Sequence, residues 1–402
     1  MLPPLSGPRA AAVAAVLALA PSLLAGPAGI SSPALAQPDS SPSAVYSPGP
    51  LTDGSPAPEP AAQAWILADL ASGEVYASHA PELQHAPAST IKLLSGLALV
   101  DVLDDPEAMH EATYEDMRVD GTKVGLLQKN EYSIDDLFHA MLMSSANDAA
   151  HALADAAGGQ DEAVELMNEK ADDLRLTGTQ AWNTSGLDED DQVTTVTDLL
   201  RIGRAVLEDD YLMDVISTTE YDFPGATNPN TGEELPGYPI QNHTRIVGEV
   251  DGGLGLKNGY TRAAGGSFVA VVERDGRRLA SAVLGGETMT RDSAVDLIEW
   301  GFAQESPQPI DTVSFETAAE AAETAAAQTP PASATSEHGA SAGSHSAGSD
   351  AVGAADGLAA DGGSALPQIL LVCGVGLGAA TAAGLWLRVR KDRRRRRERT
   401  AR

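Results

Sequence analysis

Apolar runs near both ends of the central part of the chain predict β-hairpins. Residues 64–70 form one run, and a turn at 71–73 that contains Gly73 separates it from the shorter run 74–77. A second hairpin comprises residues 266–272, a turn at Asp275-Gly276 and residues 278–284. Because the hairpins lie at opposite ends of the same region, we expect one sheet assembled from both ends.

Between and after the hairpins, apolar residues recur at the spacing of amphipathic helices. The expected helices are residues 90–103, two within 134–157, and one each at 161–174, 193–207 and 291–302. Strands at both ends with helices between them predict a mixed α/β fold of the α+β kind. It would contain one antiparallel sheet of about five strands, with helices on its faces and a helical lobe inserted in the middle.

The first 36 residues have the features of an export signal. Arg9 is a short positive region, residues 10–25 are almost wholly apolar, and Ala34-Leu35-Ala36 gives the small-x-small pattern of a signal-peptidase site. Cleavage there would make Gln37 the first residue of the mature protein. An uncleaved N-terminal anchor is the alternative, although the apolar run is short for a membrane span.

The other end of the chain predicts a membrane span. Residues from Gln368 to Leu387 carry no charge, and about 20 apolar residues are enough to cross a bilayer. A run of arginine and lysine follows at once in the tail 388–402, and such a cluster marks the cytoplasmic side. We therefore expect a transmembrane helix at 367–387, a cytoplasmic tail, and a folded part on the outer side of the cell membrane.

Two segments of low complexity flank the folded part. Residues 37–61 are rich in Pro, Ser and Ala and predict a flexible leader. Residues 305–366 contain few large apolar side chains, so they cannot bury a core and are expected to form a disordered or extended tether. The folded domain would then occupy residues 62–304, a normal size for one domain.

Composition excludes several classes of protein. The formal net charge of −31 argues against a nucleic-acid partner for the folded domain. The only cysteine, Cys373, lies inside the predicted span, so the exported part has neither a disulfide framework nor a thiol nucleophile. The eight histidines show no spacing typical of metal ligands. We therefore expect no metal and no cofactor.

Ser89 and Lys92 form the first candidate catalytic pair. A serine hydroxyl is a poor nucleophile unless a base removes its proton, and residues three positions apart share one face of a helix. Lysine acts as a base only where burial or a nearby cation keeps it neutral, and the apolar residues that follow predict a buried helix. Pro87-Ala88 suits the start of that helix, whose N–H groups could help to form an oxyanion hole.

Two further motifs are ambiguous when taken alone. Ser145-Ala146-Asn147 lies in an apolar context, where its side chains could relay a proton and hold a substrate, but it could also be a helix cap. Lys257 stands between Gly255 and Gly259. That pattern is typical of a strand that a ligand can approach closely, although a lysine in a surface turn is the alternative.

The order Ser-x-x-Lys, Ser-x-Asn and Lys-x-Gly resembles the three motifs of serine penicillin-recognising enzymes. The segments that narrow the resemblance to low-molecular-mass D-alanyl-D-alanine carboxypeptidases are 87–89, 143–149, 183–188, 255–261 and 284–286. The resemblance covers about residues 62–304. It implies the fold of penicillin-binding proteins and β-lactamases, removal of the terminal D-Ala of peptidoglycan stem peptides, inhibition by β-lactams, and a role in cell-wall biosynthesis.

By position, the resemblance also implies the catalytic roles. Ser89 would form the acyl-enzyme, and Lys92 would deprotonate it. Ser145 and Asn147 would shuttle a proton and bind the peptide.

The expected substrate-binding residues continue along the third motif. Lys257 would supply positive charge near the nucleophile, and Asn258 and Gly259 would line the site. The backbone N–H groups of Ser89 and Tyr260 would form the oxyanion hole. Arg291 matches a family arginine that helps to bind the terminal carboxylate, but it could equally be a surface residue beside Asp292.

Two departures from the family pattern and two other functions stay open. The family usually has Thr or Ser at the position of Asn258, so both carboxypeptidase and endopeptidase action stay open. Family members often carry a β-rich domain where this chain has its tether. A β-lactamase would need a positioned carboxylate for deacylation, for which residues 188–190 are the nearest candidate. A non-catalytic muropeptide-binding protein would have no need of Ser89 and Lys92.

Overall fold

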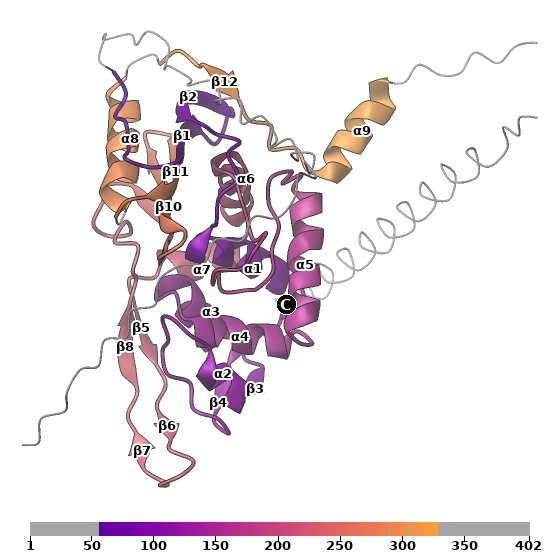
Figure 1. The fold of residues 1–402 in the computed structure, drawn as a ribbon, viewed down its shortest axis with the longest axis vertical. Helices are drawn as coiled ribbons and strands as arrows, with labels where there is room; N and C mark the ends of the chain where they lie inside the picture. Colours follow the sequence, from indigo (N-terminus) through magenta and orange to yellow (C-terminus); the bar gives the residue numbers. More distant parts are fainter. Residues whose placement is uncertain (1–55, 289, 305–306, 329–402) are drawn as a thin grey trace, which may run out of the picture. The chain divides into compact units, whose positions relative to one another are not determined.

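The computed structural model describes residues 56–288, 290–304 and 307–328. Its centre is an antiparallel sheet in the order β12-β2-β1-β11-β10-β9 (Figure 1). The strands are β1 (Ala64–Asp69), β2 (Glu74–His79), β9 (Gly253–Thr261), β10 (Gly265–Arg274), β11 (Arg277–Gly286) and β12 (Asp311–Thr312). Ala64 on β1 pairs with Leu284 on β11. The sheet is thus assembled from both ends of the domain, as the sequence predicts.

Helices cover both faces of the sheet. On β1, Ile66 belongs to the core shared with the helical lobe, whereas Trp65 and Leu67 belong to a second core under α8 (Arg291–Ala303). Helix α6 (Val196–Val206) packs on the opposite face, against β1, β10 and β11 (Figure 1). Because both faces are buried, β1 is a continuous apolar run rather than an alternating one.

The inserted lobe surrounds one buried helical segment. Its elements are η1 (Ala88–Ile91), a 3₁₀ turn, followed by α1 (Lys92–Leu99), α3 (Ile134–Met143), α4 (Asn147–Ala156) and α5 (Gln160–Asp173). All eight residues of α1 are buried, and the helix packs against α3, α4, α5 and α6. Ser133 and Asp136 form a reciprocal capping box that starts α3. The lobe therefore fixes α1 from several sides.

Several short elements are not predicted from the sequence. They are α2 (Tyr114–Arg118), α7 (Asp210–Ser217), β3 (Met109–Glu111), β4 (Glu131–Ser133), β5 (Glu220–Phe223), β6 (Ala226–Thr227), β7 (Glu234–Leu235) and β8 (Tyr238–Gln241). Most residues of the short strands are exposed or half-buried. With few residues facing a core, they carry no apolar periodicity that could reveal them.

The predicted domain boundaries at 62 and 304 are too narrow. Ala57 is buried in the core under α8. Beyond residue 304, β12 pairs with β2, and α9 spans Ala318–Gln328, so the prediction of a disordered or extended tether is wrong for these residues. Val313 is buried and donates from its backbone to the carbonyl of Gly73 at 2.8 Å. The Ala- and Glu-rich composition lacks core residues but has high helix propensity.

The predicted signal peptide 1–36, the leader up to residue 55, the transmembrane helix 367–387 and the tail 388–402 lie outside the described residues. Within the part of the chain that the structure describes, none of the helices has the length and apolar character needed to cross a membrane.

Candidate active site

Ser89 lies in the first turn of the helical segment formed by η1 and α1. The preceding Ala88 has a φ of +47°, a left-handed conformation that is uncommon for a residue with a Cβ. Ser267 on β10 donates to the carbonyl of Pro87 at 2.8 Å, and Thr90 donates to the same carbonyl at 2.7 Å. These contacts hold the turn against the sheet and leave Ser89 half-buried. Strained turns of this kind gather at functional sites.

Lys92 is fully buried, and its Nζ atom faces three oxygen atoms. Nζ lies 3.0 Å from Ser89 Oγ and 2.7 Å from Asn147 Oδ1, and it also donates to the carbonyl oxygen of Ser185. The amide and carbonyl oxygens carry no proton to donate. A neutral amine that donates its two N–H groups to them therefore directs its lone pair at Ser89. This geometry suits removal of the Ser89 proton.

The surroundings of Lys92 favour its neutral form. Burial lowers the pKa of Lys92 well below its ordinary value of 10.5, and the charge of Lys257 lowers it further, whereas the Asp148 carboxylate raises it. Burial also lowers the pKa of Lys257 to about 7. Desolvation disfavours the charged form of an amine, and a catalytic base works best when its pKa lies near the working pH. Lys92 thus meets the electrostatic requirement for a base.

The Ser-x-Asn motif lies in the tight connection between α3 and α4. Ser145 is buried and has a φ of +64°, and it does not cap α4, whose N-terminus has no side-chain cap. The helix-cap alternative is therefore wrong. Asn147 donates from Nδ2 to the carbonyl of Asp120 and from its backbone to that of Thr122, both at 2.7 Å. Because Nδ2 is held in this way, Oδ1 faces Lys92.

The Lys-x-Gly motif lies on β9, at one edge of the sheet. Lys257 is fully buried, so the surface-turn alternative is wrong. Its Nζ atom donates to the carbonyl of Asn258 at 2.9 Å and to Asn258 Oδ1 at 3.2 Å. At Gly259, a Cβ would lie 2.6 Å from the backbone nitrogen of Ser89. Only glycine lets the strand pass this close to Ser89, so the first and third motifs are in direct contact.

Among the described residues, Tyr260 and Arg291 form no hydrogen bond with Ser89 or Lys92. Tyr260 follows Gly259, and the residue is 53 % exposed. The Arg291 guanidinium donates to the carbonyl of Arg245 at 2.9 and 2.7 Å, and to Asp292 at 3.0 Å. It also lies 3.6 Å from Glu249. These contacts match the surface alternative, and binding of a carboxylate by Arg291 stays a prediction, as does the oxyanion role of the Tyr260 N–H.

Sequence reasoning missed two groups at the site. The carbonyl of Ser185 accepts from Lys92, but a backbone oxygen has no signature in the sequence. His243 is exposed, and its backbone N–H donates to the carbonyl of Met143 at 2.9 Å. Partial desolvation and the charge of Lys257 lower the pKa of its imidazole. The imidazole therefore feels the charge of Lys257 on the third motif. A lone histidine in a loop gives no spacing signal that could have identified it.

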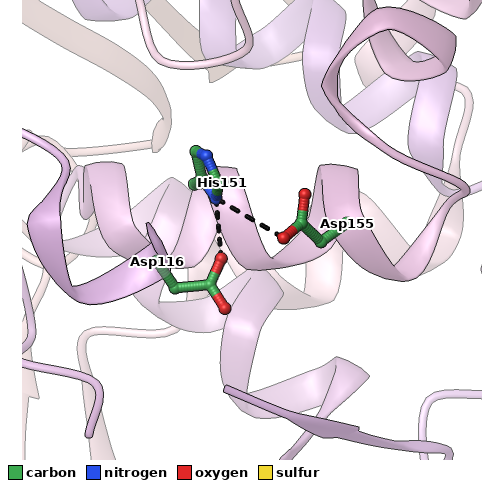
Figure 2. A group of neighbouring side chains, drawn as sticks. All are labelled: Asp116, His151 and Asp155. Carbon is green, nitrogen blue, oxygen red and sulfur yellow. Dashed lines mark hydrogen bonds and ion pairs between the residues drawn. The ribbon is translucent and has the colours of Figure 1, made fainter. Parts of the chain in front are cut away.

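A separate cluster joins α2 to α4. His151 Nδ1 lies 2.7 Å from Asp116 Oδ1 and 3.8 Å from Asp155 Oδ2 (Figure 2). Each of the three residues offers one atom that could ligate a metal ion, and these atoms lie within 4.8 Å of one another. The second oxygen of Asp116 accepts from Thr113 N at 2.7 Å and lies 3.3 Å from His110 Nε2.

Burial by itself raises the pKa of the Asp116 carboxyl, but the hydrogen bonds from His110, His151 and Thr113 outweigh it and hold the pKa below its usual range. These bonds occupy both oxygens of Asp116, so we interpret the cluster as an ion-paired tie between the two helices. The expectation that the protein needs no metal stays a prediction.

Comparison with known proteins agrees with this geometry. The family described as D-alanyl-D-alanine carboxypeptidase (peptidase S11) matches residues 52–288. The D-alanyl-D-alanine carboxypeptidase DacB2 of Mycobacterium tuberculosis is 37 % identical over 256 residues, which cover 62 % of this chain and 84 % of the relative. DacC of Escherichia coli is 32 % identical over 264 residues, which cover 61 % of this chain and 62 % of the relative.

Solved structures give the same picture. The crystal structure of a D-alanyl-D-alanine carboxypeptidase from Mycobacterium tuberculosis H37Rv has a TM-score of 0.61 and 34 % identity, and the match covers 67 % of this chain and all of that one. A DD-transpeptidase from Streptomyces, 20 % identical with a TM-score of 0.56, supports the fold alone. With the family match spanning more than half of its length, the chain belongs to the serine D-alanyl-D-alanine carboxypeptidases of the S11 peptidase family.

Proposed function

We propose that this enzyme removes the terminal D-Ala from peptidoglycan stem peptides through an acyl-enzyme on Ser89, and that β-lactams acylate the same hydroxyl. The observation that carries the proposal is the contact of Lys92 Nζ with Ser89 Oγ at 3.0 Å, in a site where burial lowers the pKa of the lysine. A binding protein would have no use for such a pair, because an activated nucleophile serves covalent chemistry.

Acylation begins when neutral Lys92 takes the proton of Ser89. The Ser89 oxygen bonds to the carbonyl carbon of the penultimate D-Ala, and the carbonyl oxygen becomes an oxyanion. The backbone N–H groups of Ser89 and Tyr260 are the proposed donors to that oxyanion, a type of stabilisation that is often the largest single contribution to catalysis. The closeness of Gly259 to the Ser89 nitrogen supports this arrangement.

The intermediate then collapses and releases the terminal D-Ala. The C–N bond breaks as the leaving nitrogen receives a proton, which Ser145 would pass on from protonated Lys92. Lys92 is again neutral after this step. Water then attacks the acyl carbon, Lys92 accepts the water proton, and the Ser89–acyl bond breaks as that proton returns to Ser89 Oγ. Protons balance over the cycle, and the products are the shortened peptide and D-Ala.

Recognition of the terminal carboxylate would fall to Lys257 and Asn258. Lys257 donates to the side-chain oxygen of Asn258 at 3.2 Å, which leaves the Asn258 Nδ2 group as a donor for a ligand. A charged lysine beside an amide donor suits a carboxylate better than a neutral peptide. This favours carboxypeptidase over endopeptidase action even though Asn258 departs from the hydroxyl that the family usually has here.

We also propose that the enzyme is exported and anchored in the cell membrane. Support comes from the uncharged segment 367–387 followed by the basic tail 388–402, which together predict a span with its tail in the cytoplasm. Truncation after residue 366 should then release the active enzyme from the membrane fraction. Recovery of the truncated protein in that fraction, at the level of the full chain, would contradict the anchor.

The activity is tested with the full-length chain and a peptide that ends in D-Ala-D-Ala. We expect release of D-Ala by the wild type and none by Ser89→Ala. Equal release by both proteins would refute the role of Ser89, and no release by either would refute the activity. Fluorescent penicillin separates the related functions, because long-lived labelling supports a carboxypeptidase whereas rapid turnover would indicate a β-lactamase.

A further inference from the structure

Residues 183–188 pass beside Ser89, since its Oγ lies 3.4 Å from the Ser185 carbonyl and a Cβ on Gly186 would lie 3.0 Å from the Ser89 nitrogen. The chemistry described so far uses only one backbone oxygen of this segment. We propose that Asn183 is a positioning residue that holds the Ser185 carbonyl where it accepts an N–H of Lys92, and so directs the lone pair of the base at Ser89. The inference rests on the proposed role of Lys92 and adds a residue to which the family resemblance assigns no role.

The Ser185 carbonyl faces both catalytic side chains. Lys92 Nζ donates to it, and Ser89 Oγ lies 3.4 Å from it. Asn147 Oδ1 supplies the other proton-free acceptor of Lys92. When its two N–H groups donate to two acceptors in fixed places, the direction of the lone pair on the amine nitrogen is determined as well. If the Ser185 carbonyl turned away, an N–H could point at Ser89 in place of the lone pair, and the base would be misdirected.

Asn183 determines the orientation of the peptide groups around that carbonyl. Its Oδ1 atom accepts from the backbone nitrogens of Ser185 at 3.1 Å, Gly186 at 2.8 Å and Leu187 at 3.2 Å. The Ser185 hydroxyl also donates to it at 3.1 Å, and Asn183 Nδ2 donates to the Leu187 carbonyl at 3.0 Å. The C=O of Ser185 belongs to the same peptide unit as the N–H of Gly186. Because that N–H is held toward Asn183, the carbonyl must point the other way, toward Lys92.

Other contacts secure the positions of the segment without orienting this peptide unit. Thr184 donates to the Ala150 carbonyl on α4 at 3.2 Å, and its own carbonyl accepts from Ser95 on α1 at 2.8 Å. Further along, Asp188 accepts from Thr261 at the end of β9 at 2.6 Å. These bonds place the segment between the lobe and the sheet. The peptide unit between Ser185 and Gly186 lies between the anchored residues Thr184 and Asp188, and its N–H donates a hydrogen bond to the Asn183 side chain.

A matched control distinguishes positioning from stability alone. Asn168 on α5 has the same kind of network: its Oδ1 accepts from Ala181 N at 3.0 Å, and its Nδ2 donates to the carbonyls of Ala181 and Val164, both at 3.0 Å. It therefore holds the start of the same loop without touching residues 185–187. Asn168→Ala should weaken the fold as Asn183→Ala does, while leaving the Ser185 carbonyl in place.

The experiment measures the acylation of full-length protein by excess fluorescent penicillin, which separates the rate constant of acylation from the dissociation constant of the first complex. We expect Asn183→Ala to slow acylation by about 100-fold, as small misplacements of a catalytic group do, with little change in the dissociation constant. Asn183→Asp keeps the acceptor oxygen and should stay within about tenfold of the wild type. Asn168→Ala should acylate at the wild-type rate. Thermal unfolding of each variant gives the folded fraction at the assay temperature.

Each result has a definite meaning. The proposal is overturned if Asn183→Ala acylates like the wild type, if Asn168→Ala slows to the same degree once corrected for folded protein, or if Asn183→Asp is as slow as Asn183→Ala. A wild-type chain that is never acylated would instead overturn the proposed function itself. A slow Asn183→Ala beside normal rates for Asn168→Ala supports the positioning role.

Discussion

The strand that carries Gly259 passes so close to Ser89 that a methyl group on the Gly259 α-carbon would lie 2.6 Å from the Ser89 nitrogen. The same methyl group would lie 2.5 Å from Ser267 Oγ, which holds the turn before the nucleophile. The glycine of the third motif is therefore a steric requirement. It brings the edge of the sheet to the first turn of the nucleophile helix, where the oxyanion donors are expected.

Gly259→Ala should consequently slow acylation by a penicillin, because strand β9 and the Ser89 turn must move apart. A shift of about 1 Å at a catalytic centre can cost on the order of 100-fold in rate. Gly96→Ala is the matched control: Gly96 lies on α1 with Lys92, and among the described residues the side chain nearest to a Cβ there is that of Leu212, at 3.6 Å. Equal rates for the Gly259 variant and the control would contradict the close-packing argument.

The pH dependence of acylation reports the protonation of Lys92. Because the neutral amine is the proposed base, the rate constant of acylation should rise with pH through the pKa of Lys92 and level off above it. Lys257→Met removes a positive charge that lowers this pKa. In the variant, the rising part of the plot of the acylation rate constant against pH should therefore move to higher pH, as measured at saturating penicillin. A rising part that stays in place, or moves to lower pH, would show that the two amines are not coupled in this way.

Lys257 should also cost stability. Its pKa falls from 10.5 to about 7 on folding because burial disfavours the charged amine. Below pH 7 the lysine is protonated in both states, so the full cost of burying the charge destabilises the folded state. Lys257→Met removes this cost and should stabilise the fold at pH 7 by up to roughly 4 kcal/mol.

The sign of the pH dependence provides the check. The stability gain of Lys257→Met should be largest at or below pH 7 and should shrink as the pH rises from 7 toward 10.5, because the wild-type lysine is then neutral in both states. Denaturant unfolding across this range measures it. As a control, Lys170→Met removes a surface ion pair with Asp101, which is expected to be worth about 1 kcal/mol or less. A gain that grows with pH would contradict the account.

Asn258 can be tested through the substrate carboxylate. Asn258→Thr places a hydroxyl where the family usually has one, and we expect a lower KM for a D-Ala-D-Ala peptide, by up to about tenfold, with a smaller change in kcat. The same peptide with a C-terminal amide should show no gain, because it lacks the charged group. If KM falls equally for both peptides, the residue at position 258 does not bind the substrate carboxylate.

Much of the fold follows from local patterns. The turn at Asp275-Gly276 and the runs beside it predict the hairpin of β10 and β11, and apolar spacing predicts the long helices. The short strands from β5 to β8 are not predicted from the sequence, because few of their side chains face a core. Helix α9 is not predicted for another reason: its Ala- and Glu-rich sequence lacks the large apolar residues by which a packed segment is recognised.

The site divides in the same way. The spacing of Ser89 and Lys92 predicts their contact, because three residues apart on a helix is a local relationship. The contact of Lys92 with Asn147 joins residues 55 positions apart, so it could be inferred only from the resemblance to a family. The Ser185 carbonyl lay beyond both approaches, since every residue has a carbonyl and only the tertiary structure shows which one reaches the base.

The most direct measurement is the mass of the intact full-length chain after treatment with a penicillin, followed by mapping of the modified peptide. The account predicts one penicilloyl group per chain, attached to Ser89, and none in Ser89→Ala. Attachment at another serine, such as Ser145, or a wild-type chain that gains no mass while it remains folded, would contradict the claim that Ser89 is the acylated nucleophile.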